Sequence, residues 1–167
     1  MRITLIAAVA RNGVIGTAEG GIPWHLPRDI QHFREYTQGK PLLLGRKTFA
    51  EMQGWFADHS PIVMTLDRNF QTEIAFVAHD MAAAIEYTQD QGREELVVCG
   101  GAEIYDLSMP FATDLMITFV DAKVAGSVYF PDFESIASWL TISQVRHEAD
   151  SENAHAVTFC HFKRIES

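Results

Sequence analysis

The sequence has few cysteines, no excess of basic residues and no long apolar run, and each absence narrows the class of protein. Its 167 residues include 2 Cys, and 13 Lys and Arg stand against 22 Asp and Glu, giving a formal net charge of −9. Cys99 and Cys160 lie far apart in strand-like stretches, which favours buried thiols in a reduced, cytoplasmic protein over a disulfide scaffold. The acidic balance argues against nucleic acid and anionic membrane surfaces as partners. No apolar run reaches the ~18–20 residues that a membrane helix requires.

Two familiar site signatures are also missing. The 7 His and 2 Cys show neither His-x-x-x-His nor Cys-x-x-Cys spacing, so no metal site is predicted. No Gly-x-Gly-x-x-Gly fingerprint follows a strand, which argues against the usual dinucleotide-binding fold. The overall composition, with 47% hydrophobic and 21% charged residues, is ordinary for a folded chain of this length. We therefore expect one domain spanning residues 1–167.

A helix is predicted from Pro27 to Thr37, because proline suits the first turn of a helix and Gly39 is placed to end it. Its apolar residues recur at helical spacing and should face inward: Leu26, Ile30 and Phe33. The opposite side is expected to face solvent and consists of Arg28, Gln31, His32 and Glu35.

Asp29 breaks this pattern. It projects beside the apolar stripe, so we expect it in a pocket of low polarity, where an ionised carboxylate is unfavourable unless something pairs with it. No Lys or Arg lies three or four residues away to form a local ion pair. Its two oxygens would match a ligand edge with two adjacent N–H donors, such as the amino-pyrimidine edge of a pterin. The alternative is an aspartate stabilised only by the helix dipole.

A strand followed by glycine and then a helix occurs twice, in residues 41–52 and 95–107. Glycine allows a ligand to approach the backbone closely, and the free N–H groups of a helix start attract phosphate. The first junction adds the charges of Arg46 and Lys47 and the hydroxyl of Thr48. Two such junctions would suit the two ends of a pyrophosphate-bridged dinucleotide.

The other segments complete an α/β pattern. Strands are predicted at 3–9, 60–65, 73–78, 114–121, 140–147 and 154–164, with a helix at 81–89 and a glycine-rich loop at 11–21 as a candidate lid. Strands that alternate with helices and end in a hairpin indicate a mixed α/β sheet with helices on both faces and a C-terminal antiparallel hairpin.

Several blocks, taken in order, resemble the dihydrofolate reductase family. They are Leu5–Ala10, Val14–Gly16, Ile22–Pro27, Gly45–Phe49, Gly100–Tyr105 and Phe130–Pro131. The resemblance implies an eight-stranded, mainly parallel sheet, a monomer, and NADPH-dependent reduction of 7,8-dihydrofolate to 5,6,7,8-tetrahydrofolate. Hydride would pass to pterin C6 while N5 gains a proton from water, with Asp29 orienting the substrate. The resemblance also implies a cis bond between Gly100 and Gly101.

The same resemblance assigns roles by position. The catalytic set would be Asp29, Trp24, Thr118 and Tyr105. The substrate contacts would be Ile6, Ala7, Ala8, Asp29, Phe33, Met52, His59, Cys99 and Thr118. The cofactor contacts would be Ala8, Ile15, Gly45, Arg46, Lys47, Thr48, Met64, Thr65, Cys99, Gly100, Gly101, Ala102, Glu103 and Ile104.

One position departs from the family. His59 stands where an arginine normally pairs with the α-carboxylate of the folate glutamate tail, and loss of that pair would weaken tail binding roughly ten- to a hundredfold. Arg34 is a second candidate for the tail. His59 therefore motivates an alternative, a reductase of the same fold acting on a tail-less pterin or on the ribosylamino-pyrimidine of riboflavin synthesis. A non-catalytic pterin or nucleotide binder is the alternative from another class.

Overall fold

The computed structural model describes residues 1–166 and contains one sheet of eight strands. The strands are β1 (Arg2–Ala10), β3 (Pro41–Gly45), β4 (Ser60–Met64), β5 (Phe76–Ala78), β6 (Glu95–Gly100), β7 (Asp114–Val120), β9 (Trp139–His147) and β10 (Val157–Arg164). They follow the order β5-β4-β3-β6-β1-β7-β10-β9. The pairs from β5 to β7 are parallel, and β10 runs antiparallel to both β7 and β9. The expected mainly parallel sheet with a C-terminal hairpin is confirmed.

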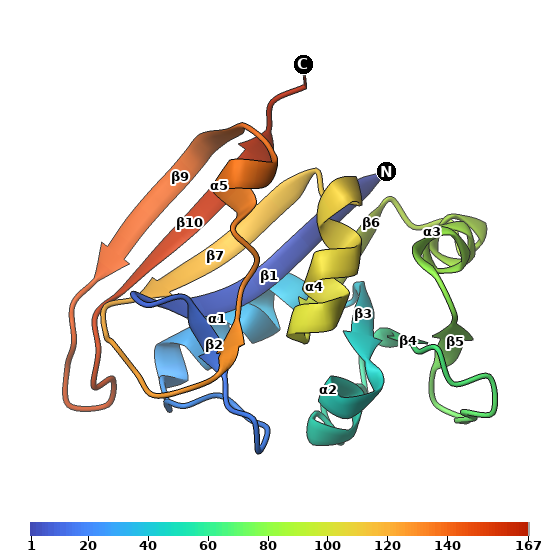
Figure 1. Ribbon diagram of the computed structural model, residues 1–167, viewed down its shortest axis with the longest axis horizontal. Coiled ribbons are helices and arrows are strands. Elements are labelled where there is room, and N and C mark those ends of the chain that lie inside the picture. Colours follow the sequence, from blue (N-terminus) through green and yellow to red (C-terminus); the bar gives the residue numbers. More distant parts are fainter. Residues whose placement is uncertain (167) are drawn as a thin grey trace.

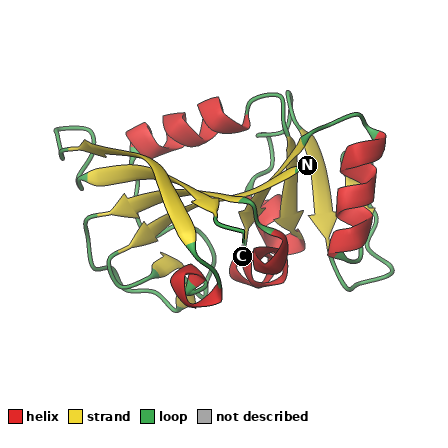
Figure 2. Ribbon diagram, turned by 90° about the horizontal axis from the view of Figure 1, so that it is seen from above, coloured by secondary structure: helices red, strands yellow, loops and turns green. Residues whose placement is uncertain are grey.

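Helices cover both faces of this sheet (Figures 1 and 2). They are α1 (Pro27–Thr37), α2 (Arg46–Glu51), α3 (Met81–Asp90), α4 (Ala102–Ser108) and α5 (Phe133–Ile136), with a 3-10 turn, η1 (Met109–Phe111), directly after α4. The predicted bounds of α1 agree with the structure. No helix within residues 1–166 is long and apolar enough to cross a membrane.

The central strand β1 explains why a separate core forms on each face of the sheet. Successive side chains of a strand point to opposite faces. Leu5 therefore joins the core that includes Ile104 and Tyr105 of α4, whereas Ile6 joins the core on the other face with Phe49 of α2. A near-continuous apolar run is what a strand buried on both faces needs.

The predicted glycine-rich loop 11–21 is wrong in part, because its residues Val14–Gly16 form strand β2. This strand pairs with β8 (Val128–Tyr129) in a separate two-stranded antiparallel sheet. Gly126 permits the close approach, since an added Cβ there would lie 2.6 Å from the carbonyl oxygen of Gly16. The pairing partner lies more than a hundred residues away, so the local sequence gave no signal for it.

Two strand boundaries and one helix face also differ from expectation. The predicted strand 73–78 is shortened to β5, because the N–H of Ile74 donates to the Thr72 hydroxyl in a local turn. The last strand, β10, begins at Val157 rather than at residue 154. The prediction that His32 faces solvent is wrong. Its ring stacks on Phe159 of β10, with 4.1 Å between centroids, because β10 reaches over that side of α1.

Candidate active site

A cavity of about 1390 Å³ opens where β1, β3, β4 and β6 end and the first turns of α2 and α4 begin. Ligand sites of open α/β sheets form at the carboxyl ends of the strands, so the fold itself places a site here. Sequence-predicted site residues that line the cavity are Ile6, Ala7, Ala8, Ile15, Asp29, Phe33, Gly45, Arg46, Lys47, Thr48, Met52, Met64, Thr65, Cys99, Gly101, Ala102, Glu103, Ile104, Tyr105 and Thr118.

Three predicted residues are not among those that line the cavity. Trp24 packs instead against the small core that includes Leu26 and Val157. Gly100 is buried beneath the Tyr105 ring, and His59 lies at the end of the loop before β4.

Asp29 lies in the first turn of α1 and points into an apolar part of the cavity, beside Ile30 and Phe33. Burial raises the pKa of the Asp29 carboxyl, and a side-chain hydrogen bond with Thr118 partly opposes that rise. No salt bridge to Asp29 is found within residues 1–166. The helix start is held by a different group, because the buried Asn153 side chain accepts a hydrogen bond from the N–H of Arg28 at 3.0 Å. The Asp29 oxygens therefore remain available to a ligand.

Tyr105 lines the cavity and is held in place by a hydrogen bond. Its hydroxyl donates to the carbonyl oxygen of Ile6 at 2.6 Å and so ties α4 to β1. Burial holds the pKa of Tyr105 well above its ordinary value, so this phenol is not a proton donor of ordinary acidity. The Tyr105 ring also explains why position 100 is a glycine, because a Cβ added there would lie 2.9 Å from the ring. The φ of Gly100, +101°, is likewise a conformation that favours glycine. The Gly100–Gly101 bond is cis, as the resemblance implied.

Two helix starts face the cavity without side-chain caps. Gly45 precedes α2 and Gly101 precedes α4, and neither position provides a side-chain acceptor for the first turn. Such N–H groups attract phosphate oxygens. The two junctions also touch, because an added Cβ on Gly45 would lie 3.0 Å from Ile104. The residues present thus fit a pyrophosphate group, which would find backbone donors from both sides.

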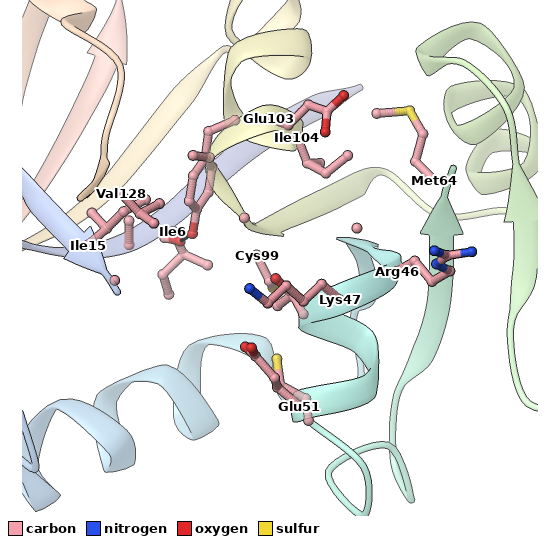
Figure 3. Close-up of a pocket in the computed structure, with 18 of the residues that line it drawn as sticks. Ile6, Ile15, Arg46, Lys47, Glu51, Met64, Cys99, Glu103, Ile104 and Val128 are labelled. Carbon is pink, nitrogen blue, oxygen red and sulfur yellow. Dashed lines mark hydrogen bonds between the residues drawn. The ribbon is translucent and has the colours of Figure 1, made fainter. Parts of the chain in front are cut away.

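The cations of this region point in different directions. Figure 3 shows Arg46 extending toward Met64 and Lys47 extending the opposite way, toward the part of the cavity near Ile6. A nitrogen of the Arg46 guanidinium lies 3.0 Å from a carboxylate oxygen of Asp67. A ring nitrogen of His79 lies 2.7 Å from the carbonyl oxygen of Thr65 at the same end.

Sequence reasoning missed many of the residues that line the cavity. The segment Gly16–Ile22 was predicted only as a candidate lid, Ile30 and His32 lie within α1, Val128 lies in β8, and the others come from turns and helix ends without a distinctive pattern. They are Gly16, Thr17, Gly20, Gly21, Ile22, Ile30, His32, Glu51, Trp55, Leu66, Asp67, His79, Asp80, Met81, Ala82, Leu107, Phe111 and Val128.

His59 and Arg34 lie in different surroundings. Nε2 of His59 is 3.4 Å from the Thr37 hydroxyl oxygen, and its Nδ1 is buried without a hydrogen-bond partner. The Arg34 guanidinium carbon is 4.3 Å from the centre of the Trp55 ring, and that ring lines the cavity. Within residues 1–166, no group of three or more His, Cys, Asp or Glu is placed to hold a metal ion.

The strand ends of this mainly parallel sheet form one cavity, which contains a carboxylate in its apolar part and is faced by two uncapped helix starts. This is the architecture of an α/β nucleotide-binding enzyme. The sequence model described as dihydrofolate reductase matches residues 2–164. The chain therefore belongs to the dihydrofolate reductase family.

Individual relatives agree with this assignment over nearly their full lengths. The chain is 36% identical to dihydrofolate reductase type 3 of Salmonella typhimurium, over 98% of this chain and 99% of that protein. It is also 36% identical to dihydrofolate reductase of Neisseria meningitidis serogroup A, with the same two coverages. Dihydrofolate reductase of Enterococcus faecalis complexed with NADP(H) and RAB-propyl superimposes with a TM-score of 0.89 at 29% identity, covering 99% of this chain and 97% of that one.

Proposed function

We propose that the protein reduces 7,8-dihydrofolate to 5,6,7,8-tetrahydrofolate with NADPH. The observation that carries this proposal is the Asp29 carboxylate, which lies in an apolar cavity without a cationic partner. Membership of the family and the NADP(H) bound to the Enterococcus faecalis enzyme support the choice of reaction and cofactor.

Asp29 would accept hydrogen bonds from the 2-amino group and the adjacent ring N–H of the pterin, and Thr118 would steady the carboxylate. The resemblance to the family implies that the proton for N5 would come from water. Asp29 raises the local proton affinity and orients the ring. Ile6 and Phe33 would wall the pterin and exclude bulk water.

NADPH would supply the hydride from C4 of its nicotinamide to C6 of the pterin. The uncapped starts of α2 and α4 would bind its pyrophosphate, with Arg46 and Thr48 adding a charge and a hydroxyl. Backbone groups of Ala8 and Ile15 would orient the carboxamide.

The test is the steady-state rate of NADPH oxidation with 7,8-dihydrofolate in the unaltered protein and in Asp29→Asn. We expect a loss of kcat/KM of roughly a hundredfold or more in the variant. Asp90→Asn, an exposed residue at the end of α3, is the matched control and should retain full activity. Full activity of Asp29→Asn would exclude the role proposed for this carboxylate.

A second candidate, reduction of a pterin without a glutamate tail, is favoured by the buried and unpaired Nδ1 of His59. The two substrates are separated by comparing 7,8-dihydrofolate with the same dihydropterin lacking glutamate. Strong preference for the glutamylated compound would assign the tail to His59, Arg34 or both. Equal efficiency would assign a smaller pterin as the substrate.

We further propose that residues 1–167 act as one domain and as a monomer in the cytoplasm. A single sheet joins both ends of the described chain, which supports one domain. Cys99 and Cys160 are free thiols, as a reducing compartment would keep them. Sedimentation at micromolar concentration tests the monomer, and a dimeric mass would refute it.

A further inference from the structure

Asp67 engages two of the groups that the proposed cofactor would need. Its carboxylate pairs with the Arg46 guanidinium at 3.0 Å, and its backbone N–H donates to the Thr65 hydroxyl oxygen at 3.1 Å. All three residues line the cavity at the end away from Asp29. The resemblance to the dihydrofolate reductase family implies that Thr65 would flank the adenosine 2′-phosphate of the cofactor, and Asp67 contacts Thr65.

The Asp67 carboxylate is held in place by its own turn. One of its oxygens accepts the backbone N–H of Asn69 at 2.9 Å, the local bond of an Asx turn. The other oxygen accepts from Arg46, whose guanidinium carbon also lies 5.9 Å from the centre of the Phe70 ring. The negative charge is therefore a fixed feature of this end of the cavity.

No other arginine or lysine lining the described cavity offsets this charge. Arg46 and Lys47 are the only two, and Lys47 extends away from Met64 and places its ammonium nitrogen 3.4 Å from the Ala18 carbonyl oxygen (Figure 3). Leu66, beside Asp67, is 80% exposed and brings no charge. Of the arginines and lysines that line the described cavity, only Arg46 extends toward this end, and it is already paired with Asp67. His79 lies at the same end, and Arg68, which follows Asp67, is exposed and does not line the cavity.

The two forms of a nicotinamide cofactor differ in what they bring to this position. A 2′-phosphate monoester carries about −1.5 to −2 charges at neutral pH and must compete with Asp67 for Arg46. A 2′-hydroxyl is neutral, and an acidic side chain can accept its hydrogen bond, as in NAD-binding folds. Repulsion by Asp67 therefore acts more strongly on NADPH, which carries the additional phosphate, than on NADH.

We propose that Asp67 is a specificity-determining residue that lowers the preference of this protein for NADPH over NADH. The inference rests on the proposed function, because it takes the adenosine end of the cofactor to lie against Arg46 and Thr65. It goes beyond that function by assigning to one acidic residue the choice between two cofactor classes.

The test is calorimetric titration of the protein, without substrate, with NADPH and with NADH. Asp67→Asn keeps an acceptor oxygen for the Asn69 N–H but removes the charge. NADPH should bind about three- to tenfold more tightly to this variant, whereas NADH binding should change less than about twofold. Asp80→Asn is the charge-matched control, because Asp80 lines the same cavity but contacts neither Arg46 nor Thr65. Asp80→Asn should change the affinity for NADPH by less than half as much as Asp67→Asn does.

Arg46→Gln, made alone and together with Asp67→Asn, tests the mechanism. Removal of Arg46 should weaken NADPH binding more when Asp67 is already neutral, because the guanidinium is then free for the phosphate. Equal effects of Asp67→Asn on both cofactors, or no effect on either, would overturn the inference while leaving the proposed function intact. If the unaltered protein bound neither cofactor, the proposed function would fail and the inference with it.

Discussion

Replacing Asp29 by Asn should make the free protein more stable while it abolishes turnover. The folded state binds a proton at Asp29 more tightly than the unfolded chain does, because burial raises the pKa of this carboxyl above the ordinary value of 3.8. This preference for the protonated carboxyl contributes fully to the free energy of unfolding when the pH is below 3.8. The contribution is lost as the pH rises through the pKa that Asp29 has in the folded protein. At neutral pH the ionised carboxylate is therefore unfavourable to folding.

The size of the effect follows from what surrounds Asp29. The side chain lacks a cationic partner and shares one hydrogen-bonding interaction with Thr118, which the amide of Asn can keep in part. Access to the open cavity limits the penalty, so we expect a gain of about 1 kcal/mol in the free energy of unfolding at neutral pH. For a chain of this length that corresponds to a rise in Tm of about 2–4 °C.

Urea denaturation and calorimetry at neutral and mildly acidic pH would measure this gain. The difference between Asp29→Asn and the unaltered protein should shrink as pH falls, since the unaltered carboxyl then becomes protonated. Asp90→Asn, the exposed control, should stay within about 0.5 kcal/mol at each pH. A lower Tm for Asp29→Asn at neutral pH would refute the reasoning, because it would show that the folded chain already compensates the charge.

Three further changes test other parts of the structure. His59→Arg should lower KM for 7,8-dihydrofolate roughly tenfold without changing KM for the tail-less dihydropterin, and equal KM changes would exclude a role in tail binding. Gly100→Ala should destabilise the fold by at least about 2 kcal/mol in urea denaturation, because its φ of +101° is unfavourable for alanine and its Cβ would meet the Tyr105 ring at 2.9 Å. For Asp114 burial raises the pKa, but hydrogen bonds from His161 and a neighbouring hydroxyl outweigh it and hold the pKa below its ordinary value. Stability from Asp114 should therefore be lost as pH falls through that lowered pKa, and Asp114→Asn should flatten the acid side of the stability curve.

The elements that were predicted correctly carry their signals locally. The limits of α1 are marked by Pro27 and by Gly39, whose φ is +71°. The run of β1 is apolar on both faces because helices cover both faces, and the sequence shows this as a lack of alternation. Asp29 was recognisable as a site residue because it interrupts an apolar stripe at helical spacing.

The elements that were missed depend on partners distant in the sequence. Strand β2 exists because β8 lies beside it, and His32 is covered because Phe159 of β10 reaches it. The pairing of Asp67 with Arg46 joins residues 21 positions apart, one at the start of α2 and the other in the turn after β4. Spacing within one element cannot reveal such contacts, and they decide much of the charge and shape of the cavity.

Apart from the buried Nδ1 of His59, several groups that the described chain leaves without a partner face the cavity. Asp114, buried at the start of β7, accepts a hydrogen bond from His161 at 2.8 Å and has a cationic neighbour, Arg2. Asp29, by contrast, has no cation, and the helix starts after Gly45 and Gly101 have no side-chain caps. Each of these omissions lowers the stability of the free protein, yet all of them face one continuous space. A ligand with two adjacent N–H donors would satisfy Asp29, and the pyrophosphate of a second ligand would satisfy the two helix starts, so the cavity suits the ternary complex of the proposed reaction.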